Sequence, residues 1–331
     1  MHDALSPVSL ADIEAARGRL RGIAVRTPLL RLSGAPEGGP TILLKLENLQ
    51  PIGSFKLRGA VNAMAVAGSA AVAKGVVTAS AGNMAQGVAW AAREAGVRCR
   101  VIAPETAPRT KIEAIERLGG EVIPVPFDAW WQTLLDRRYP GVDGLFVHPF
   151  ADAAVMAGNG TIGLEILDDA PDVDAILVPY GGGGLSCGIA AAVRAVKPAT
   201  RVYAVEVESS APFAAALASG EPTPLPANPS FIDGIGGRNV FPEMWPLARE
   251  LLAGSVAASV AEIAGAVRLL VERNRIVAEG AGAAPVAAAL YRPPIDAKTI
   301  VCVISGGNID SDVLATILRG EVPVKAPPKE H

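Results

Sequence analysis

Histidine and cysteine are both scarce in this sequence of 331 residues. The three histidines are His2, His148 and His331, and two of them lie at the chain ends. Histidine-rich metal sites and most histidine-based catalysis are therefore not expected. The three cysteines lie far apart and form no CxxC pair, which argues against disulfides and favours a reducing cytoplasm; they are Cys99, Cys187 and Cys302.

An excess of charge of either sign is also missing, because 30 basic residues face 33 acidic ones and the net charge is −3. The sequence thus lacks the basic surface that nucleic acid or an anionic membrane would require. No apolar run reaches the roughly 18 residues that span a bilayer. Residues 1–21 include Asp3, Asp12 and Glu14 in a helical pattern, so no signal peptide is expected. Small molecules and further copies of the chain are the expected partners.

Hydrophobic residues make up half of the sequence, enough for a large core in one or two domains. Ser9 predicts the N-cap of a helix that ends near Leu20. Strands alternate with helices at 85–95 and 108–118 and with later alanine-rich helices; the strands are predicted at 41–46, 75–78, 99–103, 121–125, 145–148, 175–179, 201–207 and 299–305. This alternation predicts an α/β protein whose parallel sheets carry helices on both faces. A surface connection is expected at 220–229 and a frayed tail at 326–331.

Open parallel sheets bind ligands beyond the carboxyl ends of their strands, so the strand-to-helix turns are where chemistry is expected. One turn holds four consecutive glycines, 181–184, between a strand ending at Pro179 and a helix starting near Leu185. Its backbone amides and the helix dipole are suited to a phosphate. A tight turn without a ligand is the alternative, but four glycines are more than a turn requires, and each costs conformational entropy.

Two further glycine motifs point to functions that we reject. Residues 184–188 match the G-x-S-x-G elbow of α/β-hydrolases, but the only histidine after this serine is His331. Residues 158–163 match the dinucleotide fingerprint, but they follow a predicted helical stretch. The next strand ends in Pro179 and Tyr180, with no acidic residue for a ribose. Neither a hydrolase nor an NAD-binding protein is expected.

Lys56 lies in the segment PIGSFKLRG, 51–59, within the first turn of a helix predicted to begin near Ser54. A lysine is ordinarily exposed and inert, but the helix dipole disfavours a cation here, and a lowered amine pKa would suit a nucleophile. The turns SAGN, 80–83, and SGGN, 305–308, offer amides for a carboxylate, although helix capping explains either one alone. Together the turns describe a ligand with phosphate, carbonyl and carboxylate parts.

This combination resembles the fold-type II pyridoxal 5′-phosphate (PLP) enzymes, and within them the threonine/serine dehydratase and serine racemase family. The resemblance covers nearly the whole chain, and its markers stand in the family's order at 46–51, 53–56, 80–86, 181–185, 233–234, 279–282 and 305–308. It implies a tryptophan synthase β-like fold of two open parallel-sheet domains with the cofactor between them. The implied division is a large domain of 1–70 and 151–325, a small domain of 71–150 and a tail of 326–331.

The resemblance also implies roles for single residues. Lys56 would form the internal Schiff base with PLP, Phe55 would flank the ring and Asn83 would bond the ring hydroxyl. Ser305 would face the pyridine nitrogen, and because a serine does not enforce a pyridinium, elimination is favoured over transamination. The phosphate would bind to Gly181, Gly182, Gly183, Gly184 and Leu185, with Gly234 and Glu279 completing the cofactor site. The substrate carboxylate would bind to Ser80, Ala81, Gly82, Asn83 and Met84.

The implied reaction is β-elimination from a small β-hydroxy amino acid such as threonine or serine. The Lys56 amine removes the α-proton, the β-hydroxyl leaves with acid help from the cofactor phosphate, and hydrolysis gives a 2-oxo acid and ammonia. An amino-acid (serine) racemase is the nearest alternative, but racemases of this family carry a serine where this chain has Ala81. A PLP-binding protein without turnover is the other alternative.

Two positions depart from the family's pattern. Met84 stands where a histidine is usual and favours a larger or more apolar substrate. Ser210 and Pro212, which follow Glu206, do not reproduce the ligand set of the metal-activated members, so no metal is expected. The sequence stops near Glu330, so the regulatory domain of biosynthetic threonine deaminases is not expected. We expect a homodimer or homotetramer, and the sequence does not identify the β-hydroxy amino acid.

Overall fold

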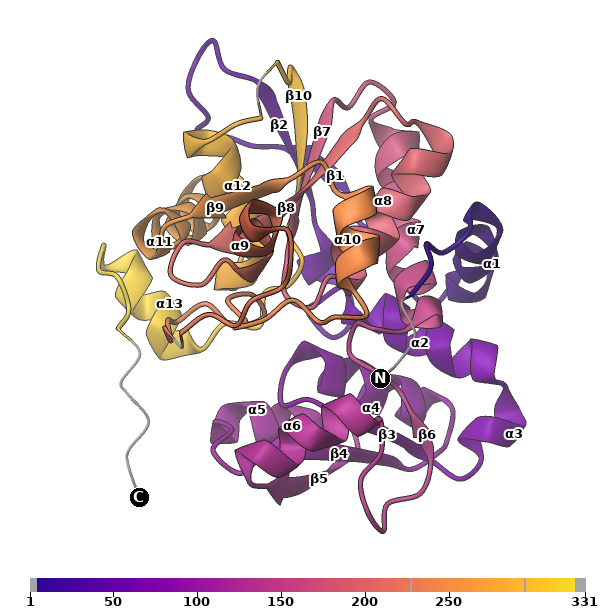
Figure 1. Cartoon of the computed structure of the whole chain (residues 1–331). Coiled ribbons are helices and arrows are strands. Elements are labelled where there is room, and N and C mark those ends of the chain that lie inside the picture. Colours follow the sequence, from indigo (N-terminus) through magenta and orange to yellow (C-terminus); the bar gives the residue numbers. More distant parts are fainter. Residues whose placement is uncertain (1–4, 227, 295, 325–331) are drawn as a thin grey trace.

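The computed structural model describes residues 5–226, 228–294 and 296–324, whose strands form two sheets (Figure 1). The larger sheet has six strands, and only its edge strand β1 pairs antiparallel with its neighbour. In spatial order the strands are β1 (Leu29–Arg31), β2 (Thr41–Lys45), β10 (Thr299–Val303), β7 (Ala175–Pro179), β8 (Arg201–Val207) and β9 (Ser255–Ala258). The smaller sheet is wholly parallel and consists of β5 (Gly120–Val125), β4 (Cys99–Pro104), β3 (Val76–Ala79) and β6 (Leu145–Phe146).

Helices cover both faces of the six-stranded sheet (Figure 1). Its strands are buried on both sides, so alternate residues such as Ile176 and Leu177 enter two different core clusters. One face is covered by α1 (Leu10–Leu20), α7 (Ala153–Asp169), α8 (Gly184–Val196), α9 (Pro212–Ser219) and α10 (Trp245–Leu251). The other face is covered by α11 (Val260–Leu269), α12 (Gly280–Tyr291) and α13 (Ser311–Leu318), with the π-turn η2 (Leu270–Asn274) after α11.

The four-stranded sheet is covered in the same way, and Val76 and Val77 point to its opposite faces. One face packs on α2 (Lys56–Ala67), α4 (Asn83–Glu94) and α5 (Arg109–Arg117), the other on α6 (Phe127–Asp136); the short helices η1 (Glu47–Leu49) and α3 (Ser69–Val72) flank α2. Helix α2 contacts both α4 and α7, so it connects the helices that cover the four-stranded sheet with those that cover the six-stranded sheet. The domain boundaries at 70 and 150 stay a prediction.

Most predicted elements are confirmed. Strands β7 and β8 have the predicted bounds, β2, β4 and β5 differ from prediction by one residue at one end, and β3 differs by one residue at each end. Ser9 caps α1 through a capping box with Asp12. The described part of 220–229 is largely exposed and has no helix or strand, and the tail at 326–331 lies outside the described residues.

Two predicted strands are too long, and two strands were not predicted. Strand β6 ends before His148, because the Nδ1 atom of His148 accepts hydrogen bonds from the amides of Phe150 and Ala151 and turns the chain. Strand β10 ends before Ser305, because the following residues bend over to pair Ser54 with Gly306. The unpredicted strands β1 and β9 are short edge strands.

The dinucleotide-like glycines lie inside α7, where they serve helix packing. A β-carbon on Gly158 would stand 2.5 Å from the carbonyl oxygen of Arg58 in α2, and one on Gly160 would stand 2.8 Å from that of Gly188 in α8. Hydrogen in place of a side chain therefore lets α7 approach both helices closely. A dinucleotide fingerprint lies in a strand-to-helix turn, whereas residues 158–163 lie within α7, so this motif does not indicate NAD binding.

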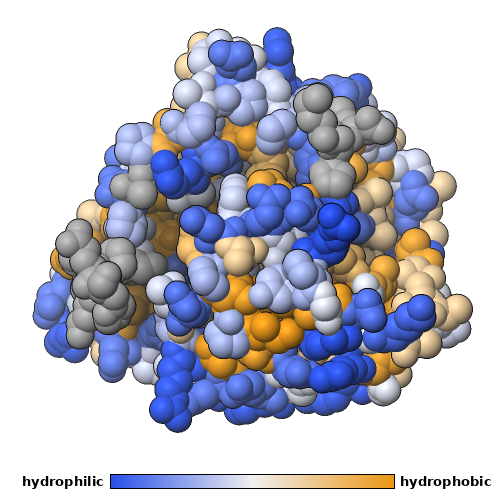
Figure 2. Space-filling view, turned by 60° about the horizontal axis from the view of Figure 1, so that its bottom comes forward, coloured by the Kyte–Doolittle hydropathy of each residue, from blue (hydrophilic) through white to orange (hydrophobic). Residues whose placement is uncertain are grey.

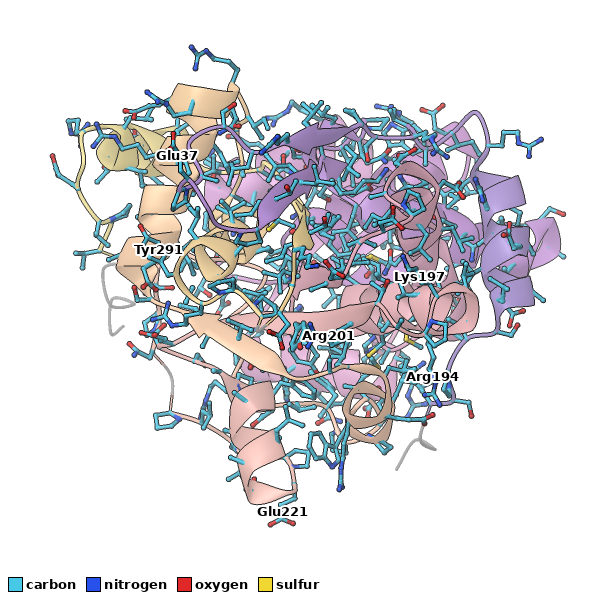
Figure 3. All side chains as sticks on the ribbon, turned by 90° about the horizontal axis from the view of Figure 1, so that it is seen from above. Glu37, Arg194, Lys197, Arg201, Glu221 and Tyr291 are labelled. Carbon is cyan, nitrogen blue, oxygen red and sulfur yellow. The ribbon has the colours of Figure 1, made fainter. Side chains whose placement is uncertain are left out.

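The carboxyl ends of the six-stranded sheet point toward the four-stranded part. Figure 3 shows the opposite end from above, where Arg201 begins β8, Lys197 follows α8 and Tyr291 ends α12. Figure 2 brings the lower part of the molecule forward and shows hydrophobic residues gathered in one area, framed by hydrophilic ones. Within the described ranges, no helix is long and apolar enough to cross a membrane.

Candidate active site

Lys56 is the first residue of α2, and its side chain is partly buried. Helix α2 packs between α4 of the four-stranded sheet and α7 of the six-stranded sheet. The Nζ atom of Lys56 donates a hydrogen bond to the carbonyl of Pro149 (2.5 Å) and lies 5.1 Å from the centre of the Phe55 ring. Burial lowers the pKa of Lys56 to about 8, although the nearby Glu279 raises it. About a tenth of this amine is therefore uncharged at pH 7, far more than for an ordinary lysine, and that fraction is available as a nucleophile or base.

The turn before Lys56 is held by the segment that follows β10. The amide of Phe55 donates to the carbonyl of Ser305 (3.0 Å), and the amide of Gly307 donates to the carbonyl of Gly53 (2.9 Å). These bonds bring Ser305, a predicted cofactor residue, next to the start of α2. Ser305 is buried, and its hydroxyl has no hydrogen-bond partner among the described residues.

Asn83, Glu279 and Asn308 form a hydrogen-bonded row beside this turn. The Asn83 amide nitrogen donates to Glu279 (2.8 Å), and the Asn308 amide nitrogen donates to the Asn83 oxygen (2.8 Å) and to the carbonyl of Ile52 (2.9 Å). Burial raises the pKa of Glu279 to about 7, against the lowering effect of the Asn83 hydrogen bond. Asn308 belongs to a motif that the sequence singled out, but it was not assigned a role.

The glycine turn presents a row of free backbone amides. Within the described chain, the amides of residues 181–186 find no hydrogen-bond acceptor, and Gly183 has a φ of +88° at the N-cap of α8. Ser186 is fully buried and donates its hydroxyl to the carbonyl of Gly183 (3.1 Å), which removes it as a nucleophile. The carbonyl of Gly234 packs on Gly181, 2.2 Å from where a β-carbon would stand. Free amides at a helix start are suited to an anion, and the binding of a phosphate by this turn stays a prediction.

The turn at 80–83 provides a second set of amides. Across the described residues the amides of Ala81, Asn83 and Met84 have no acceptor, while the amide of Gly82 donates to the Ser80 hydroxyl (3.2 Å). The Met84 side chain is buried in the core cluster that also contains Leu57. What Met84 offers to the site is therefore its backbone amide, and its side chain carries no argument about substrate size.

Two residues that the sequence analysis missed connect Lys56 with the glycine turn. Pro149 accepts the hydrogen bond from Lys56, and the ring of Phe150 lies on Gly182, 2.2 Å from where a β-carbon would stand. The Phe150 ring contacts Phe241 with centroids 4.6 Å apart, and Phe241 contacts Trp131 of α6 at 5.4 Å. We call Phe150, Phe241 and Trp131 the aromatic row. All three pack against the hydrophobic cluster that contains Ala79, the residue before Ser80.

No metal was expected near Glu206, and the hydrogen bonds of this residue show whether its carboxylate is free to bind a cation. Both carboxylate oxygens of this buried residue accept hydrogen bonds, from the amides of Phe213 and Ala214 (2.8 Å each) and from the Ser255 hydroxyl (2.6 Å). The Ser210 hydroxyl donates to the carbonyl of Gly237 (2.8 Å). These residues do not fit a divalent cation, and the absence of a metal stays a prediction.

The arrangement as a whole fits PLP. A partly buried amine stands between six unbonded amides at the start of α8 and a hydrogen-bonded asparagine at the start of α4. An aldehyde, a phosphate and a ring hydroxyl are the groups that these partners would hold. The predicted cofactor residues thus lie around the start of α2, where Lys56 stands.

Known proteins are similar to this chain over most of its length. Residues 20–306 match the family described as pyridoxal-phosphate dependent enzymes. An L-threonine ammonia-lyase from Thermotoga maritima is 40% identical over 315 residues, which cover 94% of this chain and 78% of the relative. A threonine deaminase structure from T.th. superposes with a TM-score of 0.83 at 36% identity, over 91% of this chain and 99% of that one. A serine racemase structure from Dictyostelium discoideum gives 0.84 at 33% identity, over 92% and 100%.

Proposed function

The chain belongs to the pyridoxal-phosphate dependent enzyme family, and on that premise we propose that it eliminates the β-hydroxyl group of threonine or serine to give a 2-oxo acid and ammonia. The predicted cofactor, fold type and lyase class are confirmed by the family match and by the threonine ammonia-lyase and dehydratase relatives. The observation that carries the proposal is the Lys56 amine, placed between the glycine turn and the turn at 80–83.

The parts of the site divide the binding of cofactor and substrate among them in this proposal. Lys56 holds the cofactor covalently, and the amides of 181–185 hold its phosphate. Asn83, fixed between Glu279 and Asn308, holds the ring hydroxyl, and Ser305 faces the ring nitrogen. The free amides of the turn at 80–84 hold the substrate carboxylate.

PLP supplies an electron-withdrawing ring that makes the α-proton of the amino acid acidic. The Lys56 amine takes that proton, and its lowered pKa of about 8 leaves enough free base to do so. The α-carbon–hydrogen and β-carbon–oxygen bonds break, and the hydroxyl leaves as water. The released enamine then takes up water and loses ammonia, so the atoms balance without an oxidant.

Elimination is favoured over racemisation by Ala81. A racemase needs a second acid/base group that returns a proton to the α-carbon from the face opposite Lys56. The methyl group of Ala81 cannot carry a proton, whereas elimination needs no such return. This distinction matters because a serine racemase is among the similar structures.

The aromatic row favours an uncharged substrate side chain. The Phe150 ring lies against Gly182 of the glycine turn, and all three rings pack against the cluster that contains Ala79, the residue before the turn at 80–83. We expect the side chain of a bound amino acid to lie near these rings. A charged side chain would lose its hydration against these rings without gaining a partner. We therefore expect threonine and serine to react and 3-hydroxyaspartate to be a poor substrate.

The proposed setting is the cytoplasm, with the chain acting as a homodimer or homotetramer. The three cysteines are free and buried, in keeping with a reducing compartment. Exposed apolar side chains that could support self-association include Leu49 and Val277, which are neighbours because Asn48 donates to the carbonyl of Val277 (3.0 Å). Light scattering of the purified protein tests the assembly.

The test of the proposed reaction is a keto-acid assay run beside chiral chromatography of the same incubation. With L-threonine or L-serine, 2-oxo acid and ammonia should exceed the opposite enantiomer by about 100-fold or more, because one wrong-face proton donor is missing. Ala81→Ser is the matched variant and should raise enantiomer formation. Rapid enantiomer formation by the unchanged protein, with little keto acid, would show that the reaction is racemisation.

A further inference from the structure

Four charged side chains are buried behind the helix that carries Lys56. They are Lys45 at the end of β2, Glu47 in η1, Arg58 in α2 and Glu165 in α7, and we call them the buried quartet. Lys45 and Glu47 are 0% exposed, Arg58 2% and Glu165 6%. Their charges cancel, and the reaction described above uses none of them.

Arg58 is the centre of the quartet. Its guanidinium donates hydrogen bonds to the Glu47 carboxylate from Nε and Nη2 (2.8 Å each). It also donates to the Glu165 carboxylate from Nη1 and Nη2 (2.7 and 3.0 Å). It also donates to the Thr161 hydroxyl and to the carbonyl of Val25 (3.1 Å each). Two bidentate pairs fix the plane as well as the position of the guanidinium, which a lysine could not reproduce.

The remaining members also have hydrogen-bond partners. Lys45 donates to Glu165 (2.6 Å) and to the carbonyl of Thr27 (2.7 Å), and Glu47 accepts from the Thr27 hydroxyl (2.6 Å) and from Gln50 (3.1 Å). Burying four charges is costly, and hydrophobic residues of similar volume often give equal or better stability. Fold stability is therefore a weak reason for this arrangement.

The position of Arg58 suggests a better reason. Residues two apart on a helix point to nearly opposite sides, so Lys56 faces the site while Arg58 faces the quartet. Arg58 ties the first turn of α2 to η1 on one side and to α7 on the other. The front of the same turn is held by backbone bonds between 53–55 and 305–307 and by the side-chain bond from Asn308 to the carbonyl of Ile52, and none of these contacts involves a charged side chain.

We propose that the buried quartet is a positioning device for Lys56, with Arg58 as its central residue. This inference rests on the proposed role of Lys56 as the residue that holds the cofactor. The quartet fixes the first turn of α2 from behind, so that the amine points at one place. It acts through position and not through charge, because burial and Glu279 are the influences that set the Lys56 pKa.

The test uses the purified holoenzyme and two variants. Arg58→Lys keeps the charge and loses both bidentate pairs. A quadruple variant, Lys45→Met with Glu47→Gln, Arg58→Met and Glu165→Gln, removes all four charges together and leaves no buried ion without a partner. The control is Ile166→Ala, next to Glu165 on α7, whose fully buried apolar side chain is not part of the quartet. Visible circular dichroism of the bound cofactor, kcat, KM and the thermal midpoint are measured for each.

The proposal predicts that both quartet variants fold and lose about 10-fold or more in kcat, with KM changed less than about 2-fold, because displacement of a reacting group lowers the rate steeply. Their cofactor dichroism should weaken before any substrate is added. Ile166→Ala should lower the thermal midpoint but keep kcat and the dichroism. Should the quadruple variant fail to fold, Arg58→Lys alone decides.

Normal kcat and normal dichroism in a folded quartet variant would overturn the inference and leave the quartet a structural feature. Failure of the proposed role of Lys56 looks different, because the unchanged protein would then carry no cofactor on Lys56, and failure of the proposed reaction would show in the product assay of the unchanged protein. The dichroism needs no substrate, so it separates the two failures.

Discussion

Two cations in the first turn of α2 have opposite surroundings. Lys56 is partly buried with one carbonyl partner, and burial lowers its pKa to about 8. Burial would also lower the pKa of Arg58, but Glu47 and Glu165 raise it above its usual value. The same helix start therefore carries one cation that can lose its proton and one that cannot.

This difference shows what decides whether a cation removed from water is reactive. Desolvation acts on both side chains, and the outcome depends on whether carboxylates compensate it. On the site side of α2 the single nearby carboxylate is Glu279, whose own pKa is raised to about 7 and which is therefore only partly charged near neutral pH. On the buried side two fully engaged carboxylates hold Arg58.

The largest expected effect comes from removing the reactive cation. Lys56→Ala should lower turnover by at least about 10³-fold, because it removes both the covalent attachment of the cofactor and the base. The fold should survive, since Lys56 makes one hydrogen bond. Far-ultraviolet circular dichroism checks the fold, and a keto-acid assay checks turnover. Activity within about 10-fold of the unchanged protein would place the chemistry elsewhere.

Removing the inert cation should affect stability first. Arg58→Met leaves Glu47 and Glu165 buried without their partner, so the free energy of unfolding should fall by about 3–5 kcal/mol. Arg17→Met, which breaks the exposed pair with Asp168, is the control and should change it by less than about 1 kcal/mol. Urea unfolding measures both. Equal losses in the two variants would mean that the buried pairs are no stronger than a surface pair.

The sequence predicted the reactive side of α2 better than the buried side. Lys56 stands in a turn with recognisable chemistry, and β7 and β8 were predicted with their observed bounds because they are short, mostly apolar runs. The glycine turn could also be predicted from the sequence, since its four glycines follow a predicted strand and lead into a helix. Sequence patterns of this kind predict the structure of a single strand-to-helix turn, but not which turns meet in space.

What the sequence did not predict depends on segments that meet in space. Arg58 and Glu165 are 107 positions apart, and Lys56 and its acceptor Pro149 are 93 apart. No periodicity marks such pairs. Met84 was assigned to the substrate from its position in a motif, but the direction of its side chain is set by how α4 packs in the core.

The smallest expected effect concerns the pH at which Lys56 reacts. Cofactor-free protein should bind PLP covalently with a rate that rises with pH and levels off above about 8, since the uncharged amine is the reactive form. Glu279→Gln should move this midpoint to lower pH, because Glu279 raises the Lys56 pKa. Stopped-flow absorbance measures the rate. An unchanged midpoint in the variant would remove Glu279 from the account, and a midpoint near 10.5, the ordinary lysine value, would contradict the burial effect.

The most direct test of the account is the identity of the lysine that carries the cofactor. Borohydride reduction of the purified holoenzyme, followed by proteolysis and mass spectrometry, attaches the cofactor permanently to that residue. The account predicts a single labelled peptide, with the label on Lys56. A label on another lysine, such as Lys45 or Lys111, would contradict both the proposed site and the contrast between the two sides of α2.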